Sequence, residues 1–314
     1  MTAILILLAC AAAAALCTLL TAFICFLKIF YASRKDQPTE EFSVPDGEIY
    51  QPFREQMITW MKETRSTPHR DVYVTSFDGL RLHGKFYEYA PGAPIEIMFH
   101  GYRGTAERDL SGGLCRCFSL GRSALIVDQR AAGQSEGHVI TFGVNESRDC
   151  LTWVDYVTSE LAPDAKLILT GISMGAATVM IAAAEELPAS VVGALADCGY
   201  TSAREIIQKV MRDMKLPAGL LYPFARLGAK LFGKFDPDRY APVEAMKHCR
   251  IPVIFFHGDT DDFVPHSMSI ENHRICTAHK HMVTIHHAGH GLCFPVDPEK
   301  YLSELRAFFE PILR

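Results

Sequence analysis

Short apolar segments alternate with helical patterns through most of the chain, and this alternation limits the possible folds more than any other feature. Short, mainly apolar runs of strand length occur at residues 95–99, 124–128, 167–170, 191–196 and 253–256. Helical patterns separate or follow them, at residues 107–120, 144–161, 174–186, 267–278 and 298–313. Strands buried on both faces have this continuous apolar character, so the pattern predicts an α/β fold with a mostly parallel sheet covered by helices on both faces.

Two stretches depart from this alternation. Asp78-Gly79 separates two strand-like segments, residues 71–76 and 80–89, and predicts a hairpin at an antiparallel edge of the sheet. Between Cys198 and Ile251, about fifty residues carry no strand pattern but hold helical patterns at residues 202–214 and 218–231. A structureless loop of that length is uncommon in a compact domain. We therefore expect a helical cap, at about residues 200–248, inserted over the sheet.

The N-terminus predicts a membrane anchor. Residues 2–27 contain no charged side chain, and about 20 apolar residues suffice for a transmembrane helix. A cleaved signal peptide is the alternative, but no Lys or Arg precedes the run, and the run exceeds the usual apolar length of a signal. Lys28, Arg34 and Lys35 follow it, which favours a single-pass protein with a cytoplasmic domain. We expect an anchor at residues 1–30, a polar tether at residues 31–70 and the main domain at residues 71–314.

Composition argues against two classes of partner. The formal net charge is −5, and the chain has no run of Lys and Arg of the kind that nucleic-acid binding requires. Cys115-x-Cys117 and His248-Cys249 lack the second half of a zinc site, so neither a metal nor another cofactor is expected. Outside the anchor the cysteines are odd in number and show no disulfide-framework spacing, which suits reduced thiols in the cytoplasm.

A candidate nucleophile follows the apolar run at residues 167–170. Gly171-Ile172-Ser173-Met174-Gly175 joins this strand to the helix expected from Met174, the context required of a Gly-x-Ser-x-Gly nucleophile elbow. Such pentapeptides also arise by chance, and it is the strand–turn–helix setting that favours function here. Ser173 would project above the sheet, and the N–H of Met174, at the helix N-terminus, could stabilise an oxyanion.

Two glycine-rich turns could supply the remaining donor and the base. His100-Gly101-Tyr102-Arg103-Gly104 ends the strand at residues 95–99, and the Tyr102 N–H is the candidate for the second oxyanion donor, unless this is a plain glycine turn. His290 lies between Gly289 and Gly291 and is the candidate base. His286 and His287, at a strand end, are expected to be structural.

The acid that orients the histidine has several candidates. Asp259, Asp261 and Asp262 follow the strand at residues 253–256, and at most one of them can face His290. Asp259 could cap the turn, and Asp262 could be a solvated neighbour. Asp197, at the end of the preceding strand, is a rival. With an acid from the cluster after residue 258, the order serine, aspartate, histidine is that of the α/β-hydrolases.

Taken together, these motifs resemble the α/β-hydrolase superfamily, and within it the bacterial hydrolases related to serine aminopeptidases and prolyl-oligopeptidase-like esterases. The resemblance covers about residues 71–313 and includes Phe99–Tyr102, the loop at residues 128–137 and the stretch His257-Gly258-Asp259-Thr260-Asp261-Asp262-Phe263-Val264-Pro265. It implies that Asp261 is the acid. The loop at residues 128–137 has Ala132 where the family usually has glycine.

The expected activity is hydrolysis of a small-molecule or lipidic ester, or of a thioester, by a triad of Ser173, Asp261 and His290. A peptidase acting on short peptides would use the same triad, with an additional acid to hold the free amine. A non-catalytic binding module on the same fold is a further alternative, although such proteins usually lose a triad member. The sequence does not indicate an oligomeric state.

Overall fold

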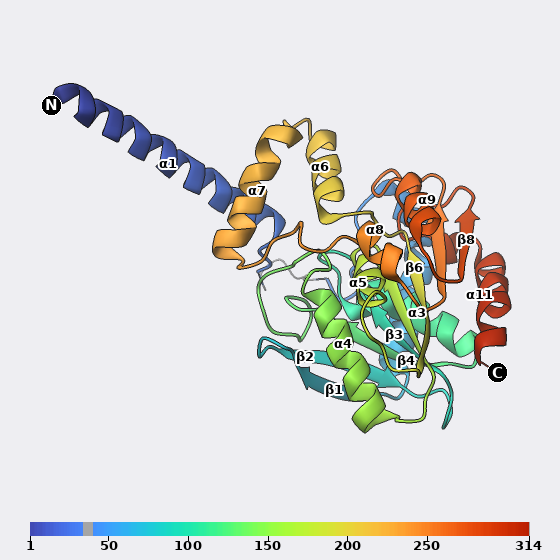
Figure 1. The fold of residues 1–314 in the computed structure, drawn as a ribbon. Helices are drawn as coiled ribbons and strands as arrows, with labels where there is room; N and C mark the ends of the chain where they lie inside the picture. The colour runs from blue at the N-terminus through green and yellow to red at the C-terminus, as the bar shows by residue number, and fades with distance from the viewer. Residues whose placement is uncertain (34–39, 314) are drawn as a thin grey trace.

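A twisted sheet of eight strands forms the centre of the computed structural model, which describes residues 1–33 and 40–313 (Figure 1). The strand order is β1-β2-β4-β3-β5-β6-β7-β8. β2 pairs antiparallel with both β1 and β4, and the remaining pairs are parallel, which confirms the predicted sheet and its antiparallel edge. The strands are β1 (Arg70–Thr75), β2 (Arg81–Tyr87), β3 (Ile95–Phe99), β4 (Ser123–Asp128), β5 (Leu167–Ile172), β6 (Val191–Asp197), β7 (Val253–Gly258) and β8 (Lys280–Ile285).

Helices cover both faces of the sheet, because successive residues of its fully buried strands point to opposite sides. In β3, Ile97 packs toward Trp153 of α4, whereas Met98 packs toward Leu114 of α3. Near the other edge, Phe256 of β7 packs against α11. The helices of the main domain are α3 (Ala106–Ser119), α4 (Glu146–Tyr156), η3 (Val157–Leu161), α5 (Met174–Ala182), α9 (His266–Ile275), α10 (Cys293–Val296) and α11 (Pro298–Leu313).

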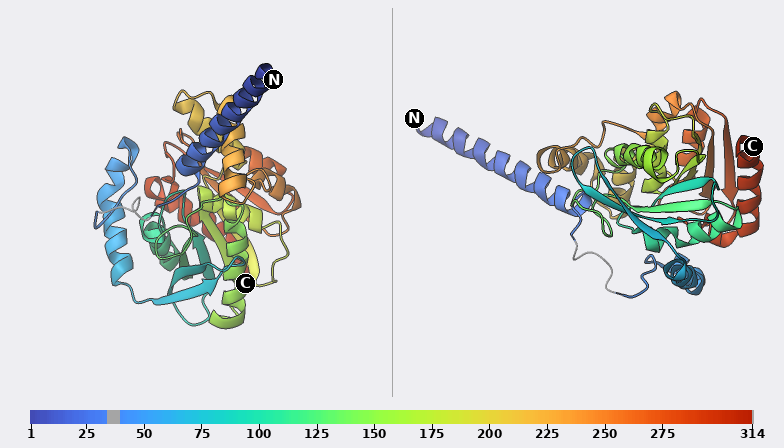
Figure 2. Two further views of the ribbon diagram at one scale, coloured as in Figure 1. Left: turned by 90° about the vertical axis from the view of Figure 1, so that its left-hand side faces the viewer. Right: turned by 90° about the horizontal axis from the view of Figure 1, so that it is seen from below.

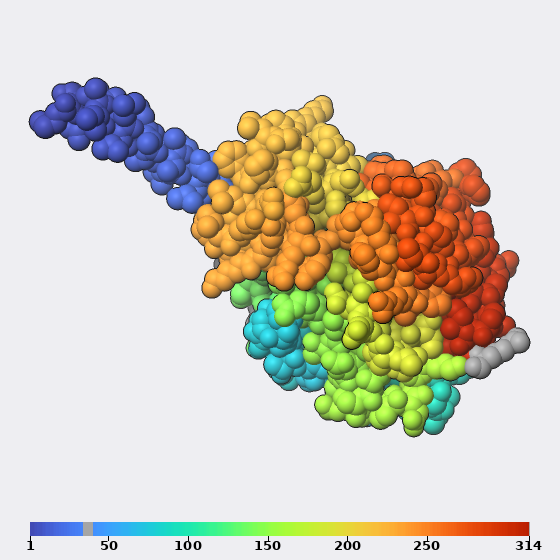
Figure 3. Space-filling model, viewed as in Figure 1, coloured from blue at the N-terminus to red at the C-terminus, as the bar shows by residue number. Residues whose placement is uncertain are grey.

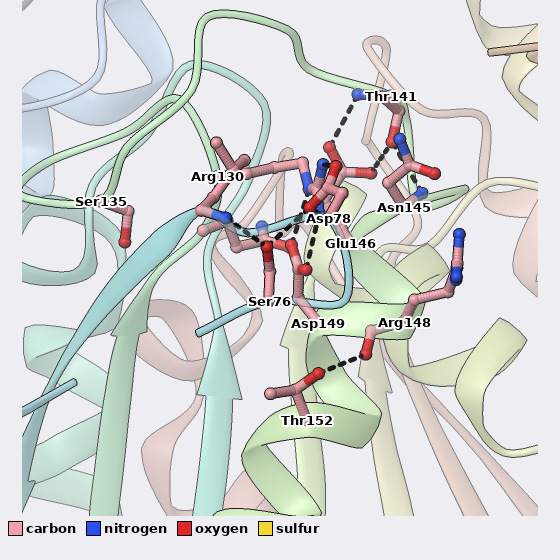
Figure 4. Close-up of polar contacts among 12 residues, drawn as sticks. Ser76, Asp78, Arg130, Ser135, Thr141, Asn145, Glu146, Arg148, Asp149 and Thr152 are labelled. Atoms are coloured by element: carbon pink, nitrogen blue, oxygen red, sulfur yellow. Dashed lines mark hydrogen bonds and ion pairs between the residues drawn. The ribbon is translucent and has the colours of Figure 1, made fainter. Parts of the chain in front are cut away.

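Two charge pairs of the buried Arg130 fix loops around the sheet. Arg130, in the loop after β4, donates from Nε and Nη2 to the two carboxylate oxygens of Asp149 in α4, each at 2.7 Å. Its guanidinium also donates to Asp78 of the β1–β2 turn, at 2.9 and 3.1 Å (Figure 4). A bidentate pair of this kind fixes orientation as well as position. The loop at residues 128–137 is therefore joined to both neighbouring segments without contributing a group to the reaction site.

The segment between β6 and β7 is helical, as the sequence predicts. It contains α6 (Ala203–Asp213), α7 (Ala218–Phe232), α8 (Pro242–Ala245) and η4 (Met246–His248). α6 and α7 form one corner of the molecule, beside the N-terminal helix (Figures 1 and 3).

The N-terminal helix α1 (Thr2–Ile29) projects from this corner (Figure 2). It is long and apolar enough to cross a membrane, a property that it shares with signal sequences. Only its C-terminal end is integrated into the domain: Ala22 and Phe26 are buried, and the next residue after the helix, Phe30, is fully buried between Phe142 and Phe235. The basic residues Arg34 and Lys35, used to predict orientation, lie outside the described residues.

The prediction of a polar tether at residues 31–70 is wrong for its second half. That part forms η2 (Glu48–Phe53) and α2 (Arg54–Ser66), and α2 packs against α3. Trp60 stacks on Phe294 at 5.5 Å and lies so close to Gly112 that a Cβ there would be 2.8 Å from the indole. Met61 is buried as well. The overall polarity of the segment concealed this apolar helical face.

Candidate active site

Ser173 occupies a strained turn between the last residue of β5 and the first residue of α5. Its φ of 56° and ψ of −114° are unusual for a residue with a side chain. The flanking glycines are required by close packing. A Cβ on Gly171 would lie 2.0 Å from the Gly175 carbonyl oxygen, and a Cβ on Gly175 would lie 2.0 Å from the Phe99 carbonyl oxygen. This is the geometry of a nucleophile elbow.

Three of the predicted site residues form one chain of hydrogen bonds. His290 Nε2 lies 2.9 Å from Ser173 Oγ, and His290 Nδ1 lies 2.7 Å from Asp261 Oδ2. Asp261 follows β7 and His290 follows β8, so both extend from the same edge of the parallel sheet as Ser173. With its Nδ1–H donated to Asp261, the neutral imidazole can accept the serine proton at Nε2.

Asp261 is held as a carboxylate by its surroundings. Its Oδ1 accepts backbone hydrogen bonds from Phe263 at 3.0 Å and Val264 at 2.8 Å. Burial alone would raise the pKa of Asp261, but hydrogen bonds from His257 and His290 outweigh it and hold the pKa well below its usual range. His257, fully buried with Nε2 3.1 Å from Asp261 Oδ2, was not among the predicted site residues. The sequence signal that could have indicated His257 is its position directly before Gly258, at the start of the stretch that resembles the α/β-hydrolases.

The other acid candidates face different partners. Asp259 accepts hydrogen bonds from His286 Nδ1 and from the His287 N–H, each at 2.7 Å. The carboxyl group of Asp197 is buried and accepts a hydrogen bond from the Tyr301 hydroxyl at 2.8 Å, and burial raises its pKa. Asp262 is exposed. Of the four candidates, the structure brings only Asp261 into contact with His290.

The serine opens into a cavity of about 260 Å³. Part of its wall comes from the segment predicted as a tether, through Pro45, Asp46, Tyr50 and Met57. The Tyr50 hydroxyl donates a hydrogen bond to the carbonyl oxygen of His290 at 3.0 Å. Sequence reasoning missed this wall, because nothing local to residues 45–57 indicates that they return to a loop more than two hundred residues away.

The candidate oxyanion loop lies beside the serine and is fastened to α1. Tyr102 lines the cavity with Ser173, and a Cβ on Gly101 would lie 3.6 Å from Ser173 Cβ. The Tyr102 hydroxyl donates to the Ile29 carbonyl at 2.7 Å, and Arg103 Nη2 donates to the Tyr31 carbonyl at 2.8 Å. Met174 begins α5, so its N–H is at a helix N-terminus. The end of α1 thus contacts the loop that carries Tyr102.

The described residues include one cluster with metal-ligand chemistry, and it coincides with this site. Ligand atoms of Cys198, Asp261 and His290 lie within 4.8 Å of one another. Two of these residues are already hydrogen-bonded to each other. Burial raises the pKa of the Cys198 thiol well above its usual range, which disfavours the thiolate that binds metals. The cluster therefore fits a proton-transfer site better than a metal site.

Comparisons with known proteins agree with this architecture. No protein-family model matches the chain. The Bacillus subtilis protein YqkD is 24% identical over 192 residues, which cover 61% of this chain and 63%, less than two thirds, of YqkD. The Pyrococcus furiosus esterase Pf2001 superposes with a TM-score of 0.66 at 18% identity, covering 87% of this chain and 99% of the esterase. Est1E of Butyrivibrio proteoclasticus, in a structure with bound ferulic acid, superposes with a TM-score of 0.58 at 19% identity. That match covers 77% of this chain and 99% of Est1E. Sheet order, elbow and structural neighbours together show that this chain has the α/β-hydrolase fold.

Proposed function

We propose that the protein is a serine hydrolase that cleaves a carboxylic ester or thioester through an acyl-enzyme. The observation that carries this proposal is the hydrogen-bonded chain from Ser173 through His290 to Asp261 at the elbow. In the first step His290 accepts the Ser173 proton at Nε2 while Oγ attacks the substrate carbonyl. The protonated His290 then delivers its proton to the leaving group. Water, activated by His290, releases the acyl group in the same way.

The developing oxyanion would be stabilised by the N–H groups of Tyr102 and Met174. Their positions beside Ser173, in the loop after β3 and at the start of α5, support this assignment. Removing one such donor typically lowers kcat by about 10²–10³. No cofactor is required by this scheme.

An ester is favoured over a peptide by the character of the cavity and by the structural neighbours named as esterases. Met57, Ile172 and Phe263 supply apolar wall. One observation supports a peptidase as the second candidate: Asp46 lies in the cavity wall and could accept a substrate amine. Arg108 and Asp109 lie in the same wall but pair with each other at 2.6 Å, so neither is free to bind a substrate amine. Parallel assays with p-nitrophenyl esters of increasing length and with aminoacyl anilides separate the two.

The Ser173→Ala variant tests the proposed nucleophile. We expect kcat on an active ester to fall by about 10⁶ and labelling by a fluorophosphonate probe to disappear, because triad members act as a unit. His286→Ala is the matched control, since His286 contacts Asp259 and is expected to leave most activity intact. Labelling that survives in Ser173→Ala would refute the assignment, and a wild-type protein that is never labelled would favour a non-catalytic module.

We further propose that α1 is retained as a membrane anchor. Cleavage of a signal peptide after α1, beyond Phe30, would remove Phe26 and Phe30, which are buried against the domain. It would also remove the carbonyl of Ile29 that accepts a hydrogen bond from Tyr102. A cytoplasmic position for the domain remains a prediction from the charges that follow the helix.

A further inference from the structure

Helix α7 presents three different faces. One face packs on the domain through small residues and Tyr222, and a second crosses α1, where a Cβ on Gly228 would lie 2.2 Å from the Ala22 carbonyl oxygen. Phe232 also belongs to this second face and contacts Phe23 with ring centroids 4.9 Å apart. The third face is apolar and is not covered within the described chain. It consists of four residues spaced three or four apart. Leu220 and Leu231 are exposed, and Phe224 and Leu227 are half-buried.

From this arrangement we propose that the third face of α7 lies in the lipid surface of the membrane, as an interfacial helix beside the proposed anchor α1. The inference rests on the proposed membrane insertion of α1. Three observations specify lipid rather than another partner.

The first observation is the level at which α7 meets α1. Residues 2–21 precede the point where α7 crosses α1, at Ala22. The most apolar stretch of α1 is not buried by the rest of the protein. At 1.5 Å per residue, these 20 residues span about 30 Å, which is the thickness of the hydrocarbon core. If they cross the bilayer, the crossing point with α7 falls at its surface.

The second observation is orientation. Figure 1 shows α7 lying across α1 rather than alongside it. A helix that crosses a transmembrane helix in this way runs in the plane of the membrane, as interfacial amphipathic helices do. Its exposed apolar face is continuous around the helix with the face that packs on α1, so both would meet the same hydrocarbon boundary.

The third observation is the distribution of charge on α7. Lys215 precedes α7 and Lys234 follows it, and both side chains are exposed. Lysines at the ends of an interfacial helix can extend to anionic headgroups while their stems remain in apolar surroundings. Arg226 and Lys230, on the polar side of α7, instead pair with Asp236, each at 2.8 Å. These two cations are thus paired with an acid of the segment that follows α7, and the apolar face is a separate stripe of the helix that lipid can cover.

Fluorescence quenching by brominated lipids tests the proposal on the full-length protein in nanodiscs. Single tryptophans are introduced as Leu220→Trp and Leu231→Trp, and the signal of native Trp60 and Trp153 is subtracted with the wild-type protein. Ile270→Trp is the matched control, because Ile270 is an apolar residue of α9 that is 47% exposed, against 49% for Leu231. Leu16→Trp reports separately whether α1 is inserted.

We expect lipids brominated near the headgroup end of the acyl chain to quench Leu220→Trp and Leu231→Trp but not Ile270→Trp. Quenching of Leu16→Trp without quenching of the two α7 positions would overturn the proposal while leaving the anchor intact. Absence of quenching at all four positions would refute the anchor and this inference together, without bearing on the catalytic assignment. A dimer by light scattering, with unquenched α7 tryptophans, would assign the face to a second copy of the chain instead.

Discussion

The carboxyl edge of the sheet and the corner formed by α1, α6 and α7 are held together by different kinds of contact. At the sheet edge, the close contacts that shape the elbow of the nucleophile join residues near one another in sequence or in adjacent strands. Gly171 meets Gly175, and Gly175 meets the end of β3. At the corner, the contacts join segments about two hundred residues apart, such as Ala22 with Gly228 and Phe23 with Phe232.

This difference has a functional consequence. The sheet edge orients reacting groups through buried hydrogen bonds, and it requires few residues beyond the triad and its supports. The corner presents apolar surface outward and contacts the loops around the active site at two places. The end of α1 contacts Tyr102 and Arg103, and Lys209 of α6 donates a hydrogen bond to the carbonyl of Asp262. A substitution at the edge should therefore alter the chemical step, whereas one at the corner should alter stability or association with the membrane.

After the loss of the nucleophile itself, the largest effect at the sheet edge is expected at Asp261. Asp261→Asn should lower kcat by about 10⁴ with the fold intact, because an amide can hold the wrong tautomer of His290 and cannot stabilise its imidazolium. Steady-state ester hydrolysis measures this directly. Asp259→Asn is the control, since Asp259 contacts His286 and His287 rather than His290. A crippled Asp197→Asn variant beside a near-normal Asp261→Asn variant would transfer the role to Asp197 and contradict the observed geometry.

A smaller effect, on stability, is expected from glycines of α7. Gly228→Ala places a methyl group 2.2 Å from the Ala22 carbonyl oxygen and should destabilise the packing of α1 on α7 by about 1–3 kcal/mol. Gly219→Ala, on the same helix, meets no atom within 4 Å and should stabilise the protein by about 0.4–1 kcal/mol. Thermal unfolding in detergent compares the two.

If both alanine variants unfold alike, α1 does not pack on α7 in solution as it does in the structure. Ester hydrolysis by folded Gly228→Ala should stay close to wild type, because Gly228 is remote from the triad. A selective loss of kcat would show that the corner also controls the chemical step. The separation of chemistry at the sheet edge from stability at the corner would then be wrong.

The same difference explains which features could be predicted from the sequence. The alternating apolar runs were sufficient for the sheet, and Gly171–Gly175 placed Ser173 because the elbow is a local structure. Cys198–Ile251 was expected to be helical, yet nothing in it indicated that α7 would pack on α1. Tyr50 could not be predicted as part of the cavity wall, since its partner is a backbone carbonyl on a distant loop. The motif that contains His257 was recognised, but no role could be predicted for this residue, because its contact with Asp261 depends on how the turn after β7 folds.

The smallest effect is expected from Tyr50→Phe, which tests whether η2 belongs to the site or merely covers it. The change removes the hydroxyl that donates to the His290 carbonyl and retains the ring. A hydrogen bond of this kind contributes about 0.5–1.5 kcal/mol, so kcat/KM should fall by roughly 2- to 10-fold.

Tyr89→Phe is the control for that measurement, because Tyr89 is 51% exposed and contacts Phe118 on another part of the domain. If the hydroxyl of Tyr50 orients the loop that carries His290, the loss should fall mainly on kcat and should be similar for short and long esters. If η2 serves only as a wall, the loss should fall on KM and grow with the size of the substrate. Equal activity of Tyr50→Phe and wild type on every ester would mean that the hydroxyl of Tyr50 does not contribute to catalysis, and that its hydrogen bond to the loop of His290 serves the structure alone.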